Sequence, residues 1–225
     1  MRDFLIASAP VMIWVLTIAE VIILILLLKI YREKKHKMPL FMALVCLGLV
    51  YDAFVMAIGS WIPESLLFGI SRIRFISHGV LVPLNLLIGG YALKWDGLKF
   101  KILAGITGLI SLAGLAAGIA RKLEIQEMAG IIRCKSSEAS PAWAEGINSL
   151  LSYGTVIPLI IFGIIVLVKQ KTPFIFLSGL LMFVFAALGP ATGNFDLIFY
   201  ISMFGELCMV LFFWLYARKY TDQKS

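Results

Sequence analysis

The chain has 225 residues, of which 61% are hydrophobic and only 15% are charged. Together with a mean hydropathy of +0.97, this composition excludes an ordinary soluble protein and is typical of an integral membrane protein. The formal net charge of +7 does not indicate nucleic-acid binding. The basic residues lie mainly between apolar stretches, where they orient helices and contact the headgroups of membrane lipids.

Seven apolar stretches fill the chain, each close to the ~20 residues that a helix needs to cross a bilayer. They predict a single all-α domain over 1–225, an integral membrane bundle of seven transmembrane helices. The expected spans are 4–30, 39–62, 70–94, 101–120, 144–168, 173–190 and 195–217. The first stretch is too long for a signal peptide and is followed by basic residues instead of a cleavage site, so it is expected to be a retained helix.

Lysine and arginine are concentrated in every second connection. The basic connections and the tail contain Arg32, Lys34, Lys35 and Lys37, then Lys94, Lys99 and Lys101, then Lys169 and Lys171, and finally Arg218, Lys219 and Lys224. The connections 63–69 and 191–194 contain neither residue type. Under the positive-inside rule this asymmetry predicts an external N terminus and a cytoplasmic C terminus, in the plasma membrane of a prokaryote.

Two features leave alternatives open. The long segment 121–143 alternates apolar and polar residues, which is compatible with an outer hairpin or an interfacial helix. In the fourth span, Gly114 and Gly118 have the spacing that lets two helices approach closely. We expect them to pack within the bundle, and a homodimer through these glycines is the alternative.

A few ionisable residues lie inside the apolar stretches: Glu20, Asp52, Arg72, Arg74, His78 and Glu206. A charge at membrane depth costs about 2.5–3.5 kcal/mol on insertion scales, so such residues are usually paired or face a cavity. These side chains therefore mark the expected polar interior of the bundle.

The third span carries the densest group of polar residues. Arg74, His78 and Asn85 follow one another at helical spacing, and Pro83 lies among them. With an external N terminus, Arg72 and Arg74 lie near the outer surface, where the alternative to ligand binding is snorkelling to headgroups. Asp52 lies at similar depth in the second span. A salt bridge to Arg74 or a hydrogen bond to His78 would satisfy it.

The remaining polar residues of the spans predict an outward-facing cavity. Glu206 lies near the middle of the last span, with Tyr200 further out, and Asn148 lies in the fifth span. The full set of expected ligand-binding residues is Asp52, Arg72, Arg74, His78, Asn85, Asn148, Tyr200 and Glu206. Glu20 lies past the midpoint of the first span and is not assigned to the site.

Two functions are consistent with such a cavity. One is binding or transport of a small anionic or lipid-like ligand, with the two arginines at the mouth. The alternative is a cofactor-free intramembrane enzyme that acts on a lipid or isoprenoid by acid–base chemistry, with Asp52, His78 and Glu206 as candidate catalytic residues. No metal or other cofactor is expected, because two histidines and three scattered cysteines do not form a zinc site.

Overall fold

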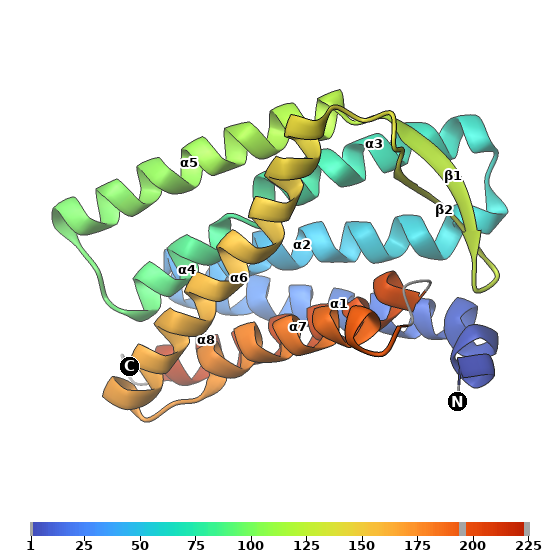
Figure 1. Ribbon diagram of the computed structural model, residues 1–225. Coiled ribbons are helices and arrows are strands. Elements are labelled where there is room, and N and C mark those ends of the chain that lie inside the picture. Colours follow the sequence, from blue (N-terminus) through green and yellow to red (C-terminus); the bar gives the residue numbers. More distant parts are fainter. Residues whose placement is uncertain (1, 194–196, 223–225) are drawn as a thin grey trace.

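The computed structural model describes residues 2–193 and 197–222 and is a bundle of long helices with one small hairpin (Figure 1). In chain order the elements are α1 (Arg2–Lys34), α2 (Lys37–Ile58), the 3₁₀ helix η1 (Gly59–Trp61), α3 (Glu64–Leu81), α4 (Leu84–Ala92), α5 (Gly97–Ala120), β1 (Leu123–Met128), β2 (Ile131–Ser136), α6 (Ala142–Gln170), α7 (Phe174–Ala191) and α8 (Ile198–Asp222).

Seven segments of this described part are long and apolar enough to cross a membrane, which confirms the expected number. They are Ile6–Lys34, Lys37–Trp61, Glu64–Ala92, Gly97–Ala120, Ala142–Gln170, Phe174–Ala191 and Ile198–Tyr220. Their ends differ from the predicted ends by a few residues, and residues 195–196 of the last predicted span lie outside the described residues. The fold is that of an integral membrane protein.

The third span consists of two helices, α3 and α4, which are separated at Pro83. Proline has no backbone N–H, so it interrupts the hydrogen-bond ladder of a helix. The chain continues through a tight turn in which the Asn85 N–H donates to the Val82 carbonyl at 3.1 Å and the Leu86 N–H donates to the Pro83 carbonyl at 3.0 Å. Asn85 consequently lies in the first turn of α4, beside the break.

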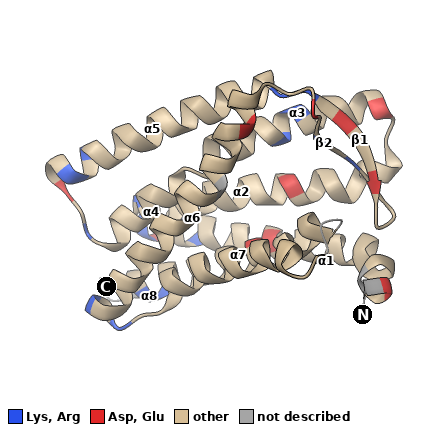
Figure 2. Ribbon diagram, viewed as in Figure 1, with Lys and Arg blue, Asp and Glu red and all other residues tan. Residues whose placement is uncertain are grey.

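The two ends of the bundle are different in composition. At one end, here the hairpin end, α1 begins and η1 and the β1–β2 hairpin lie side by side (Figure 1). At the opposite end, here the basic end, the chain makes the connections 35–36, 93–96 and 171–173, and α8 finishes there. Figure 2 shows lysine and arginine at the start of α5 and around the α6–α7 connection at this end.

The segment 121–143 forms a hairpin, which resolves the alternative left open by its sequence. β1 and β2 pair antiparallel from Leu123 opposite Ser136 to Met128 opposite Ile131. The two turn residues, Ala129 and Gly130, both have positive φ angles, +54° and +72°. A two-residue turn with two positive φ angles matches the right-handed twist of the paired strands.

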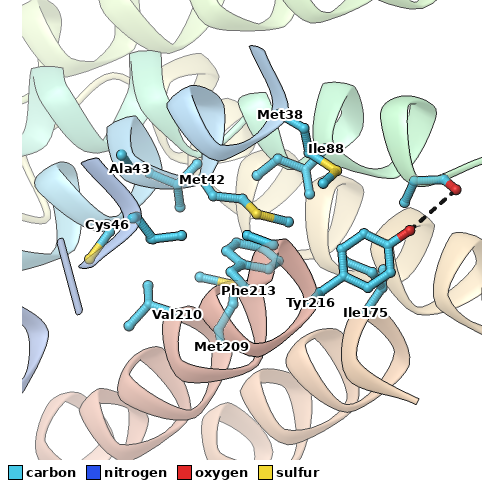
Figure 3. Packing of buried hydrophobic residues seen from close by; sticks show 14 of the residues in the cluster. Met38, Met42, Ala43, Cys46, Ile88, Ile175, Met209, Val210, Phe213 and Tyr216 are labelled. Carbon is cyan, nitrogen blue, oxygen red and sulfur yellow. Dashed lines mark hydrogen bonds between the residues drawn. The ribbon is translucent and has the colours of Figure 1, made fainter. Parts of the chain in front are cut away.

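The largest apolar core lies toward the basic end. Figure 3 shows methionines of α2 facing Phe213 and Tyr216 of α8, with Ile88 of α4 and Ile175 of α7 beside them. Phe213 and Ile175 are fully buried. This core closes the space between α2, α4, α7 and α8 on the basic side.

Candidate functional site

A cavity of about 390 Å³ lies between α2, the break in the third span, α6, α7 and α8. Most of its wall is apolar, and its polar members come from four different helices. The lining residues are Leu49, His78, Val82, Asn85, Tyr153, Val156, Met182, Phe183, Ala186, Pro190, Ile198, Ser202, Glu206 and Met209. Three of the eight predicted ligand-binding residues, His78, Asn85 and Glu206, therefore line one cavity.

Two of these polar side chains are buried with part of their hydrogen-bonding capacity unused. The Asn85 amide nitrogen donates to the Met209 sulfur at 3.9 Å, which is a weak acceptor. Asn85 Oδ1 and Glu206 Oε2 are both buried and have no hydrogen-bond partner among the described residues. A buried polar atom without a partner costs about 1–3 kcal/mol, so both side chains retain an unused capacity to accept a hydrogen bond beside the cavity.

Asp52 and Arg74 form an ion pair, which is one of the two contacts that the sequence analysis expected for Asp52. Both side chains are buried, and Arg74 also donates to the backbone carbonyl of Cys134 in β2 at 3.5 Å. The Arg74 guanidinium lies over the Phe75 ring, 4.8 Å from its centre. The pair thereby joins α2, α3 and the hairpin, and neither residue belongs to the cavity wall.

Arg72 contacts the end of a neighbouring helix. Its guanidinium donates to the carbonyls of Ile119 at 2.9 Å and Gly118 at 3.4 Å, and to the carbonyl of Arg121. The last carbonyls of a helix lack partners within that helix, and a cation there is favoured by the helix dipole. Arg72 therefore caps the C-terminal end of α5, and it does not line the cavity.

Two further arginines, which the sequence analysis did not single out, hold the hairpin onto the bundle. Arg121 pairs with Glu145 of α6 at 3.3 Å. Arg133 lies over the Phe199 ring of α8, 4.0 Å from its centre, and donates to Gln126 at 2.9 Å. Burial lowers the pKa of Arg133 to about 10, so its guanidinium remains charged at neutral pH.

The other candidate residues lie apart from the cavity. Tyr200 is buried in an apolar cluster and packs edge-on against Phe204, with ring centres 5.4 Å apart. Asn148 is half-buried on α6 and is not part of the cavity wall. Glu20 is completely buried on α1, and neither carboxyl oxygen has a hydrogen-bond partner in the described part of the chain.

Gly114 and Gly118 contact α3 within the chain. A Cβ atom on Gly114 would lie 2.2 Å from the Gly79 carbonyl oxygen, and one on Gly118 would lie 2.9 Å from Ile76 Cα. Only glycine permits this separation of α3 and α5. These two positions therefore pack inside the bundle, as the sequence analysis expected.

Sequence reasoning could not find most of the cavity wall. Met182, Phe183 and Ala186 of α7 and Val156 of α6 line the cavity, yet an apolar residue in an apolar span carries no signal of such a position. Tyr153 and Ser202 also line the cavity, and their polar character within apolar spans was the only sequence feature that could have indicated this position.

No protein-family model matches this sequence, and a search of curated proteins finds no significant relative. Among the residues that the structure describes, no group of three or more His, Cys, Asp or Glu side chains is arranged to hold a metal ion. The geometry of the cavity is therefore the main basis for a function.

Proposed function

We propose that this protein binds or transports a small ligand, which it holds in the cavity between α2, α3, α4, α6, α7 and α8. The observation that carries the proposal is that Asn85 and Glu206, each with a buried oxygen that has no partner among the described residues, line one cavity of about 390 Å³. A volume of this size is in the range of small-molecule sites, which combine apolar walls with a few placed polar groups.

Of the two ligand classes expected from the sequence, the lipid-like class has the stronger support. The cavity wall is mainly apolar, and Arg72 and Arg74 do not belong to it. Arg72 is engaged by helix carbonyls and Arg74 by Asp52. An anionic ligand would lack the two cations that were expected at the mouth, whereas an apolar ligand would gain from the walls.

We further propose that the hairpin end faces the outside and the basic end faces the cytoplasm of a prokaryote, so that the cavity lies in the outer half of the plasma membrane. The lysine and arginine asymmetry supports this orientation. A reporter that is active only in the cytoplasm should work when fused after Ser225 and fail when inserted in the 121–141 connection. The reverse pattern would contradict the orientation.

An acid–base enzyme is the second candidate, because His78 and Glu206, two side chains able to transfer protons, line the same cavity. The Glu206→Gln variant separates the two functions, since an amide keeps hydrogen bonding but cannot release a proton. A binding protein should retain its ligand in this variant. An enzyme should also retain the ligand but stop converting it, and mass spectrometry of the bound molecule would show the unconverted form.

The binding site itself is tested by a matched pair of substitutions. Asn85→Leu removes a polar group from the cavity wall and should lower the affinity for the co-purifying ligand about tenfold, the effect of one lost buried hydrogen bond. Asn148→Leu makes the same chemical change outside the wall and should leave the affinity unchanged. Native mass spectrometry measures the bound fraction. Equal occupancy in both variants and the wild type would contradict the proposed site.

A further inference from the structure

The cavity has an opening on one side, between α6 and α7. Leu49, Asn85 and Glu206, which line it from α2, α4 and α8, are buried. On α6 and α7, by contrast, Tyr153 is 61% exposed and Phe183 is 38% exposed, and both also line the cavity. The cavity therefore communicates with the outer surface of the bundle where these two rings lie.

The opening results from the oblique course of α6. Toward the basic end α6 and α7 touch closely, because a Cβ on Gly163 would lie 2.4 Å from Phe176 Cα and one on Gly179 would lie 3.1 Å from the Ile160 nitrogen. Toward the hairpin end α6 crosses to the side of α5, as Figure 1 shows, while α7 continues along α8. The two helices separate there, and the cavity lies behind the gap.

The depth of this opening determines what reaches it. At a rise of 1.5 Å per residue, Tyr153 lies about 16 Å along α6 from its first residue, Ala142. Phe183 lies about 12 Å along α7 from the last residue of that helix. The hydrocarbon core of a bilayer is about 30 Å thick. Both rings therefore lie at the depth of the acyl chains, where a membrane-dissolved molecule has access.

The polar groups inside the cavity constrain the ligand's head group. Asn85 Oδ1 and Glu206 Oε2 are acceptors without donors among the described side chains, and Arg72 and Arg74 lie outside the wall. A head group that donates a hydrogen bond, such as a hydroxyl or an amide N–H, would satisfy these oxygens. An anionic head group would lose its hydration in a mainly apolar wall that contains no Lys or Arg, and a cationic head group would find a single carboxyl group, that of Glu206, among the lining residues.

We infer that the cavity is filled sideways from the bilayer, between α6 and α7, by an uncharged amphiphile with one hydrogen-bond-donating head group and a hydrocarbon chain. This inference rests on the proposed binding function and adds the ligand class and its route. The head group lies at Asn85 and Glu206. The chain extends along Val156 and Met182 toward the opening at Tyr153 and Phe183.

The test uses the full-length protein in lipid vesicles and three photoactivatable probes that share one diazirine-bearing hexadecyl chain: the alcohol, the carboxylic acid and the amine. The alcohol should label peptides that contain Val156 and Met182 in the wild type. Val156→Trp fills the cavity from a position that is 8% exposed and should lower this labelling about tenfold. Ile161→Trp adds the same ring on the exposed surface of α6 and should leave the labelling unchanged.

Each contrary result has a distinct meaning. Equal labelling of the two tryptophan variants would show that the probe reports only surface lipid, which overturns the inference. Labelling by the acid or the amine at least as strong as by the alcohol would overturn the uncharged head group. If the alcohol does not label the cavity while Asn85→Leu still removes a co-purifying ligand, the inferred ligand class and route are wrong and the proposed function stands. If the alcohol does not label the cavity and Asn85→Leu removes no ligand, both are wrong.

Discussion

Near the basic end the space between the helices is filled by a continuous apolar core, whereas near the hairpin end it contains buried charges and an open cavity. Met209 belongs to both regions, because it packs in the core and lines the cavity. The core therefore forms the basic-side wall of the cavity. The buried ion pair of Asp52 and Arg74 thus lies in the same half of the bundle as the cavity, whereas the other half is filled mainly by apolar side chains.

The basic end is also closed by polar and aromatic contacts. The Tyr216 hydroxyl donates to Gln170 Oε1 at 2.9 Å, and the Gln170 amide donates to the Ala92 carbonyl at 2.6 Å. His36 packs against the rings of Tyr91 and Tyr220, with ring centres 5.7 Å and 5.3 Å away. Transport of a ligand through the protein would require these contacts to open, whereas binding alone would not.

The largest effect is expected from the ion pair of the hairpin half. Asp52→Asn or Arg74→Gln should each lower the free energy of unfolding by about 3–5 kcal/mol, because each leaves a buried charge without its partner. The double variant should recover part of this loss. Thermal unfolding in detergent measures the cycle, and strictly additive effects would contradict a direct interaction.

The control for this cycle is the exposed pair of Lys135 and Glu124, 3.0 Å apart on the hairpin. Water screens an exposed pair, so Glu124→Gln should leave the melting temperature unchanged. A loss as large as that of Asp52→Asn would show that the hairpin, and not the buried pair, determines the stability of this half.

A second test concerns the contact between α3 and α5. Gly114→Ala places a Cβ against the Gly79 carbonyl and should lower stability by about 1–3 kcal/mol, since two backbones must move apart. Gly105→Ala, on the same helix but with nothing within 4 Å of the added Cβ, should preserve or raise stability because alanine favours a helix. Thermal unfolding compares the two variants. Equal losses would contradict the packing of α5 on α3.

The smallest effect is expected at the basic end. Tyr216→Phe removes the hydroxyl that contacts Gln170 and should lower stability by about 1 kcal/mol. Tyr153→Phe makes the same change on a ring that is exposed at the cavity opening, and it should leave the melting temperature unchanged. A larger loss for Tyr153→Phe would show that the opening is a packed interface instead of an entrance.

The sequence predicted the features that depend on local composition. The seven spans follow from length and hydropathy, although the third was expected as one continuous span and its division at Pro83 was not predicted. The pairing of Asp52 with Arg74 was predictable because each is too costly to bury alone and both lie at similar depth.

What the sequence did not predict depends on contacts between distant segments. Arg72 caps α5 only because the end of α5 lies beside α3. The opening at Tyr153 depends on the angle between α6 and α7, which close contacts at Gly163 and Gly179 determine. Neither the angle between α6 and α7 nor the cavity-lining positions of α7 can be recognised from the sequence, because the residues involved are apolar like the rest of the span.

Under the proposed function, the cavity between α2, α3, α4, α6, α7 and α8 holds a molecule taken from the membrane. An experimental structure of the protein purified in a lipid nanodisc tests it most directly. We expect elongated density inside the cavity, with one end within hydrogen-bond distance of Asn85 and Glu206 and the other directed between Tyr153 and Phe183. A cavity that contains only water, or that is closed by contact of α6 with α7 along their whole length, would contradict it.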